Sequence, residues 1–309
     1  MRRAGSGCTS GHSRGYGRGV TTEIPFSPLP LDKSDVRYLH GPESSAHEGV
    51  PSGTAIELGW NESTAYPGTS RKVWVYVPAR YDPAEPASLV VFQDGEGFLD
   101  PSDEFRAAIV LDNLIDRGDL PVTIGVFVEP GTPDGAEDQG GPKQRNVEYD
   151  AFDDRYVTFL TEEIIPEVTA RWSIIGDHDR WGICGFSSGG NCAFTAAWLR
   201  PDVFRRVGCC LPSFAQMPGG NRYPARIAQT SAKPLRVFMQ AGHRDLGWNE
   251  PEWNWLANNL RVAAALAEAG YDFRLVLGDG GHNANHGGAL LPDAFRWPFG
   301  RTAAEQQHA

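Results

Sequence analysis

Cysteine is scarce in this 309-residue sequence and is not arranged as a disulfide framework. The cysteines number five, and two of them are adjacent: Cys8, Cys184, Cys192, Cys209 and Cys210. Disulfide-stabilised domains usually carry an even number of spaced cysteines, so this pattern argues against that class. We expect Cys184 and Cys192 to be small buried apolar residues, and the protein to work in a reducing compartment.

Long apolar runs are also absent, and basic residues are outnumbered. No run reaches the roughly 18 apolar residues that suggest a transmembrane helix. Met1-Arg2-Arg3 is followed by Gly, Ser and Arg instead of an apolar segment, which argues against a secretory or twin-arginine signal and predicts a cytoplasmic protein. Lys and Arg total 28 against 39 Asp and Glu, a net charge of -11. This charge disfavours nucleic acid or an anionic membrane surface as a partner.

The sequence does contain enough apolar residues for an ordinary core, since 40% are hydrophobic and 22% charged. Residues 1–34 are rich in Gly, Ser, Arg and Pro without apolar periodicity, so we expect a disordered tail there. Residues 35–300 show neither an internal repeat nor a shift in composition. They predict a single domain, with a C-terminal tail over residues 301–309.

Apolar patterns along the chain alternate between the period of a strand and that of a helix. Strands are predicted at 54–60, 71–78, 89–92, 122–128, 180–184, 206–211, 235–240 and 273–277. Helices are predicted at 104–117, 153–172, 191–199, 250–269 and 288–297. Pro166 should kink or split the second helix. In the fourth helix we expect Trp253, Leu256, Leu260, Ala264 and Ala267 to face inward. The alternation predicts an α/β protein, a mostly parallel central sheet with helices on both faces.

One pentapeptide, Gly185-Phe-Ser-Ser-Gly189, lies between a predicted strand and a predicted helix. It fits the G-x-S-x-G nucleophile elbow, in which a strained turn exposes a serine above the sheet. Glycines two residues before and after the serine leave room for that turn. Ser187 is therefore the candidate nucleophile. The Ser188 backbone N–H, at the start of the helix, would face a developing oxyanion.

Two residues that follow later strands can complete a catalytic triad. Ligands of such sheets bind at the carboxyl ends of the strands. Asp245 follows the strand ending at residue 240, and His282 follows the strand ending at residue 277. The order Ser, Asp, His is that of α/β-hydrolases. His282 would take the Ser187 proton, and Asp245 would orient the imidazole.

Other residues compete for both roles. His286 is an alternative base, and its spacing from His282 could also suggest zinc, but the surrounding glycines disfavour a helix and no Glu follows His282. His243 lies beside Asp245 but precedes it on the same loop. Glu250 and Asp279 are alternatives to Asp245, and Asp279 is close to His282 along the chain.

Together, these motifs resemble a known family. The elbow, the upstream Gln93-Asp-Gly95, the late Gly-Gly-His282 and Arg145-Asn-Val-Glu148 are similar to the enterochelin-esterase-like branch of the esterase D superfamily. That superfamily also contains feruloyl and acetyl-xylan esterases and mycolyl transferases. The resemblance covers roughly residues 50 to 298. It implies an α/β-hydrolase fold and a serine carboxylesterase.

The resemblance also assigns roles to particular residues. It implies the triad of Ser187, His282 and Asp245. The turn after an early strand would supply a second oxyanion-hole N–H, from either Gly95 or Glu96. It implies no metal and no organic cofactor.

Arg145 and Glu148 match a pair near the site in this family. They either contact substrate or form an anchoring salt bridge. Trp248, with Phe98 and Trp253, would suit an aromatic or carbohydrate ester, and would suit core packing equally well.

The expected partner is a small-molecule ester, and the oligomeric state is left open. We see no N-terminal β-domain of the enterochelin-esterase kind, and no concentration of basic residues for a trianionic ferric siderophore. Both features argue against siderophore hydrolysis. Acyl transfer with the same triad, or a silent hydrolase fold used for binding, are the alternatives.

Overall fold

A single nine-stranded sheet forms the centre of the described protein. The computed structural model describes residues 36–136 and 144–300. Within them the sheet has the order β1-β2-β4-β3-β6-β7-β8-β9, and β5 pairs with β2. The strands are β1 Thr54–Trp60, β2 Thr69–Val77, β3 Ser88–Gln93, β4 Thr123–Val128, β5 Thr132–Pro133, β6 Trp181–Phe186, β7 Arg206–Cys210, β8 Arg236–Gly242 and β9 Asp272–Gly278.

Most of the sheet is parallel. Strands β4, β3, β6, β7, β8 and β9 pair in parallel, whereas β1, β2 and β5 add antiparallel pairs at one side. The parallel strands β3, β4 and β6 to β8 are almost wholly buried, as expected where helices cover both faces. Their carboxyl ends lie at one edge, where the loops that carry the candidate site begin.

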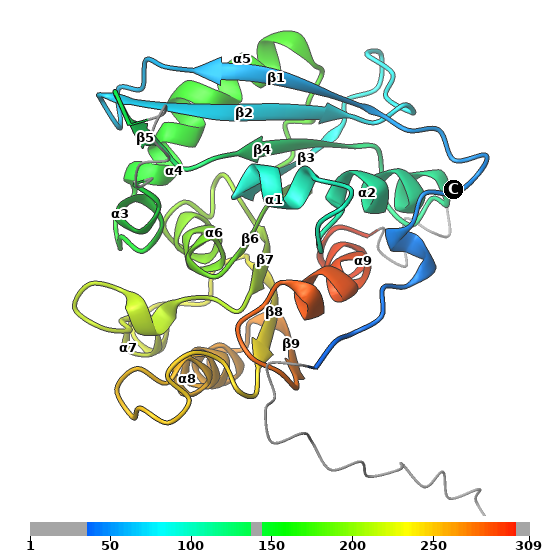
Figure 1. Cartoon of the computed structure of the whole chain (residues 1–309). Helices are drawn as coiled ribbons and strands as arrows, with labels where there is room; N and C mark the ends of the chain where they lie inside the picture. The colour runs from blue at the N-terminus through cyan, green and yellow to red at the C-terminus, as the bar shows by residue number, and fades with distance from the viewer. Residues whose placement is uncertain (1–35, 137–143, 301–309) are drawn as a thin grey trace, which may run out of the picture.

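Helices cover both faces of the sheet (Figure 1). Their bounds are α1 Gly95–Leu99, α2 Ala107–Asp116, α3 Arg145–Tyr149, α4 Arg155–Phe159, α5 Ile165–Arg171, α6 Ser188–Leu199, α7 Tyr223–Ala228, α8 Trp255–Glu268 and α9 Asn285–Phe299. One hydrophobic cluster includes residues of α4 to α8 and the other includes residues of α1, α2 and α9, on opposite sides of the sheet. The fold class predicted from the sequence is confirmed.

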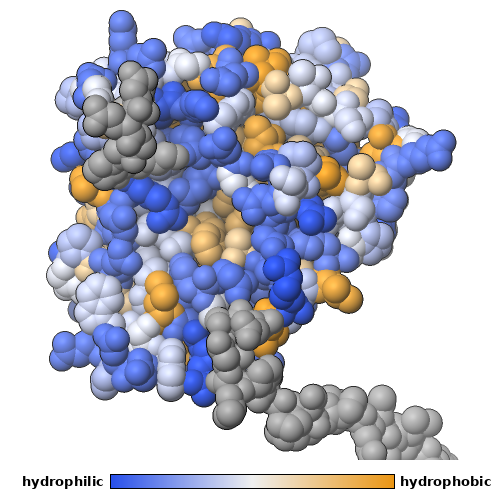
Figure 2. Space-filling model, viewed as in Figure 1, coloured by the Kyte–Doolittle hydropathy of each residue, from blue (hydrophilic) through white to orange (hydrophobic). Residues whose placement is uncertain are grey.

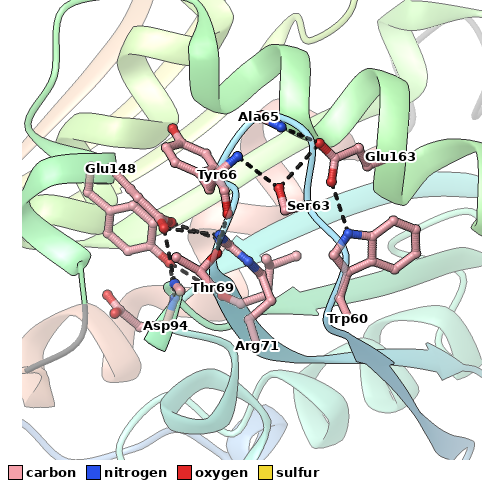
Figure 3. Close-up of polar contacts among 12 residues, drawn as sticks. Trp60, Ser63, Ala65, Tyr66, Thr69, Arg71, Asp94, Glu148 and Glu163 are labelled. Carbon is pink, nitrogen blue, oxygen red and sulfur yellow. Dashed lines mark hydrogen bonds and ion pairs between the residues drawn. The ribbon is translucent and has the colours of Figure 1, made fainter. Parts of the chain in front are cut away.

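The predicted helix over 153–172 is split. It consists of α4, a π-helical turn Leu160–Ile164 and α5, with Pro166 near the start of α5. Proline lacks an N–H, and it is tolerated at a helix start, which explains the break. The π turn carries Glu163, whose carboxylate accepts hydrogen bonds from the Trp60 indole, the Ser63 hydroxyl and the Ala65 N–H (Figure 3).

The predicted inward face of helix α8 is wrong. Trp253 precedes the helix and is exposed, and Leu260 is exposed as well. The buried residues are instead Trp255, Asn258, Asn259, Val262, Ala263, Ala265 and Leu266. Alanines occur on several sides of the helix, so the spacing of its apolar residues alone does not identify the buried face.

Three further sequence predictions concern tails, cysteines and membrane spans. The predicted tails over 1–34 and 301–309 lie outside the described residues, as does Cys8, and the single-domain boundary stays a prediction. Cys184 and Cys192 are free and buried, as predicted, and so are Cys209 and Cys210. Among the described helices, none is both long enough and apolar enough to cross a membrane.

Candidate active site

The turn between β6 and α6 holds Ser187 in a strained backbone conformation. Its φ is 59° and its ψ is -125°, which few residues other than glycine adopt. The flanking glycines are needed for space, because a Cβ on Gly185 would lie 2.2 Å from the Gly189 carbonyl oxygen. The Ser187 N–H donates to the Cys210 carbonyl at 2.9 Å, and the Ser187 carbonyl accepts from the Asn191 N–H at 3.1 Å and the Ser213 N–H at 3.2 Å. These bonds hold the strained turn.

Ser187, His282 and Asp245 form a continuous hydrogen-bonded chain. His282 Nε2 lies 2.9 Å from Ser187 Oγ, and His282 Nδ1 lies 2.6 Å from Asp245 Oδ1. The Asp245 side chain is fully buried, and its Oδ1 also accepts the Leu246 N–H at 2.8 Å. Because β7, β8 and β9 are adjacent and parallel, the loops after β8 and β9 bring the acid and the imidazole beside the elbow.

Two aromatic rings flank the imidazole of His282. The Phe186 ring centroid lies 5.1 Å from that of His282, and the Trp255 centroid lies 4.7 Å away in an edge-to-face arrangement. Trp255, the first residue of α8, was not predicted from the sequence to lie at the site. With the Asp245 hydrogen bond, the rings restrict the orientation of the imidazole.

The competing histidines lie in other surroundings. His286 stacks on Tyr38 with ring centroids 3.8 Å apart, and its Nδ1 lies 3.1 Å from the Gln240 Nε2. Burial lowers the pKa of His286 below its ordinary value. His243 Nδ1 lies 4.0 Å from Asp279 Oδ1. The contacts thus favour His282 over the other histidines beside Ser187.

The competing carboxylates do not contact His282 in the described structure. Asp279 faces His243, and Glu250 is an exposed residue of the loop before α8. The carboxylate oxygen that can accept a hydrogen bond from His282 Nδ1 belongs to the buried Asp245. Burial and this bond distinguish Asp245 from both alternatives.

The two candidate N–H groups after β3 differ in their hydrogen bonding. Glu96 donates its backbone N–H to Glu129 Oε1 at 3.0 Å, so a protein carboxylate already occupies this donor. Gly95 is the first residue of α1 and follows Asp94, whose φ of 56° is left-handed. Of the pair, Gly95 is therefore the better candidate. Ser188 opens α6, where first-turn N–H groups lack helical acceptors.

Arg145 and Glu148 do not pair with each other. The Arg145 guanidinium donates to both carboxylate oxygens of Asp94, at 2.6 and 2.7 Å, and to the Phe186 carbonyl at 3.2 Å. Its side chain is 27% exposed. Arg145 therefore joins the turn after β3 to the residue that precedes Ser187.

Glu148 forms a fully buried ion pair with Arg71 of β2 (Figure 3). Arg71 Nη1 lies 2.7 Å from Glu148 Oε2, and Arg71 Nη2 lies 3.0 Å from Glu148 Oε1. The Gly131 N–H donates to Glu148 Oε1 as well. Of the two alternatives left open for Glu148, its full burial and this ion pair favour the anchoring salt bridge, with Arg71 and not Arg145 as the partner.

The aromatic candidates for substrate binding separate into core and surface. Phe98 is 1% exposed and stacks on Phe105, so it is a core residue. Trp248 is 50% exposed on the loop after Asp245, with the Arg244 guanidinium carbon 3.9 Å from its ring centroid. Trp253 is exposed on the same loop. Figure 2 shows an apolar area enclosed by hydrophilic residues, over the region where Figure 1 places the ends of β6 and β7.

The fold and this arrangement define an α/β-hydrolase, and a family model agrees. Residues 64–296 match the Esterase family, described as "Putative esterase". Since the match covers well over half of the sequence, the chain belongs to this esterase family. The resemblance stated from the motifs is confirmed.

Similar proteins include enterobactin esterases and a ferulic acid esterase. The chain is 25% identical over 279 residues to the iron(III) enterobactin esterase of Dickeya dadantii, covering 83% of this chain and 59% of that protein. The solved enterobactin esterase of Shigella flexneri is 23% identical, with a TM-score of 0.64, over 80% of this chain and 60% of that one. A ferulic acid esterase of Anaeromyces mucronatus is 20% identical, with a TM-score of 0.63, over 84% and 95%. The chain thus spans about three fifths of the two enterobactin esterases.

Proposed function

We propose that the chain hydrolyses a carboxylic ester through an acyl-enzyme on Ser187. The observation that carries this proposal is the hydrogen-bonded chain from Ser187 Oγ through His282 to buried Asp245. A serine hydroxyl becomes a competent nucleophile when a neighbouring imidazole accepts its proton. Asp245 stabilises the imidazolium that forms, without taking the proton itself.

The reaction would proceed in two halves. Ser187 Oγ bonds to the ester carbonyl carbon while its proton moves to His282 Nε2, and the carbonyl oxygen becomes an oxyanion. The N–H groups of Ser188 and Gly95 would donate to this oxyanion. The carbon–alkoxide bond then breaks as His282 returns its proton to the alcohol. Water then attacks the acyl carbon while His282 takes one of its protons. The bond from the acyl carbon to Ser187 Oγ breaks as His282 gives that proton to Oγ, which releases the acid and restores Ser187.

The substrate we propose is a small, aromatic or sugar carboxylic ester. The relatives are named as an iron(III) enterobactin esterase and a ferulic acid esterase, and an ester of ferulic acid carries an aromatic acyl group. The exposed Trp248, stacked by Arg244, lies on the loop that carries Asp245 and could contact such a group. The net charge of -11 disfavours a trianionic ferric siderophore.

The test is hydrolysis of a short p-nitrophenyl ester by the wild type and by Ser187→Ala. Loss of the triad serine should lower kcat by about 10⁴- to 10⁶-fold without unfolding the protein. Ser44→Ala is the matched control, because Ser44 is buried and its Oγ has no hydrogen-bond partner among the described residues. Equal activity of wild type and Ser187→Ala would refute the proposal.

A further inference from the structure

A second buried carboxylate lies beside the nucleophile elbow. Asp150 follows α3 and is 2% exposed. Its Oδ2 accepts hydrogen bonds from Ser188 Oγ at 2.9 Å and Asn146 Nδ2 at 2.8 Å. Its Oδ1 accepts from Ser213 Oγ and from Asn191 Nδ2 at 3.4 Å. Four neutral donors therefore converge on one carboxylate.

Three of these four donors belong to residues that also shape the Ser187 backbone. Ser188 follows the nucleophile and opens α6. The Ser213 and Asn191 backbone N–H groups both donate to the Ser187 carbonyl. Asp150 therefore binds the side chains of Ser188, Ser213 and Asn191, and the main chains of these residues are bonded to Ser187.

The site requires an acceptor at both oxygens, which favours a carboxylate. An asparagine offers one acceptor oxygen and would direct its NH₂ group at two of the present donors. The hydrogen-bond donors that contact the Asp150 carboxylate in the described part of the chain are all neutral side chains. It contacts the first turn of α6 through Ser188 and Asn191, where the helix dipole favours negative charge.

We propose that Asp150 is a positioning residue that fixes the Ser188 N–H and the strained Ser187 turn for transition-state stabilisation. This inference rests on the proposed esterase function. Asp150 acts through Ser188, Ser213 and Asn191 and does not itself contact substrate. Donors preorganised toward an oxyanion stabilise the transition state more than the bound ester. Loss of Asp150 therefore lowers kcat and leaves KM nearly unchanged.

The test replaces Asp150 with asparagine and measures kcat, KM and the inhibition constant of a trifluoromethyl ketone. Attack of Ser187 on that ketone gives a tetrahedral oxyanion, so its affinity reports the oxyanion hole. We expect kcat to fall by about 10- to 100-fold, with KM within about twofold. The ketone should bind more weakly by about the same factor as the loss in kcat/KM.

Asp112→Asn is the matched control. Asp112 is also buried, at 8% exposed, and accepts hydrogen bonds from the Tyr76 hydroxyl and the Gly53 N–H, on α2. Neither hydrogen-bond partner of Asp112 belongs to the elbow, so kcat and ketone affinity should stay at wild-type values whatever the change in thermal stability. Ser213→Ala is a milder second variant, which removes one donor to Asp150 and keeps the Ser213 N–H. We expect it to lower kcat severalfold at constant KM.

The outcomes separate this inference from the proposed function. If Ser187→Ala remains active, the esterase mechanism fails and the inference falls with it. If Ser187→Ala is inactive while folded Asp150→Asn and Ser213→Ala keep wild-type kcat and ketone affinity, only the inference is overturned. Should Asp150→Asn not fold, the kinetics of Ser213→Ala decide the question.

Discussion

At the scale of single residues, the histidines of this protein differ in what they contact. His282 has a carboxylate on one ring nitrogen and the Ser187 hydroxyl on the other. His286, four residues later, stacks on Tyr38 and packs against Gln240. The contacts of His282 suit a base that exchanges a proton with the Ser187 hydroxyl. The surroundings of His286 favour a neutral ring, because burial lowers its pKa.

His286 should make the folded protein less stable in mild acid. Its folded pKa lies below the ordinary value of 6.5, so the unfolded chain binds more protons as the pH falls through that value. The unfolding free energy contributed by this group is therefore present above about pH 6.5 and is lost as the pH decreases toward the lowered pKa. His286→Phe keeps a ring against Tyr38 but cannot titrate.

We expect the loss of stability between pH 7.5 and 5.5 to be smaller in His286→Phe than in the wild type. Urea unfolding at both pH values measures this difference directly. The comparison is between the changes in unfolding free energy with pH, so a pH-independent destabilisation from the lost Gln240 contact does not affect it. Equal losses in the two proteins would contradict the prediction.

At the scale of elements, α3 connects the site to the sheet. A five-residue helix is not stable by itself, so contacts outside it must hold it in place. Arg145 binds Asp94, Glu148 binds Arg71, and Asn146 reaches Asp150 and Ser188. This short helix therefore links β2, the turn after β3 and the nucleophile elbow.

Glu148→Gln should destabilise the protein strongly, because it leaves the Arg71 guanidinium buried without a counter-charge. Breaking one side of a buried ion pair costs about 3–5 kcal/mol. Urea denaturation should therefore show an unfolding free energy lowered by that order. Glu167→Gln is the control, since Glu167 pairs with Arg171 at the surface. Its loss should cost at most about 1 kcal/mol, and equal effects of the two variants would exclude the anchoring role.

At the scale of the whole molecule, the sheet order brings distant segments to one edge. The elbow, the Asp245 loop and the His282 loop follow β6, β8 and β9, which run parallel with β7 among them. The chain as a whole carries a net charge of -11. A field of that sign should repel anionic substrates over distances comparable to the Debye length.

We predict that salt will favour an anionic ester more than a neutral one. The test compares p-nitrophenyl butyrate with the mono-p-nitrophenyl ester of succinic acid, which carries a free carboxylate. Between 20 and 300 mM NaCl, kcat/KM of the succinate ester should rise by about two- to fivefold, because screening weakens repulsion. The butyrate ester should change little. A fall for the succinate ester would instead indicate a locally positive site.

Much of the fold could be predicted from sequence because its signals are local. The strand-and-helix alternation depends on side-chain periods of two and 3.6, and the elbow depends on glycines around Ser187. The same local signals failed on α8, where alanines surround the helix and the buried face depends on the neighbours it packs against. They also placed the start of α2 three residues early, since Arg106 adopts a left-handed conformation before the helix.

The sequence by itself determined the class of fold, the nucleophile candidate and the order of the acid and base candidates. Only the tertiary structure placed His282, and not His286, beside Ser187. It also paired Arg145 with Asp94 and Glu148 with Arg71, and it surrounded Asp150 with four hydrogen-bond donors. Apart from the Asn146 hydrogen bond, these contacts join residues 38 to 95 positions apart. They depend on which strands become neighbours in the sheet, and hydrophobic periodicity within one segment carries no information about that order.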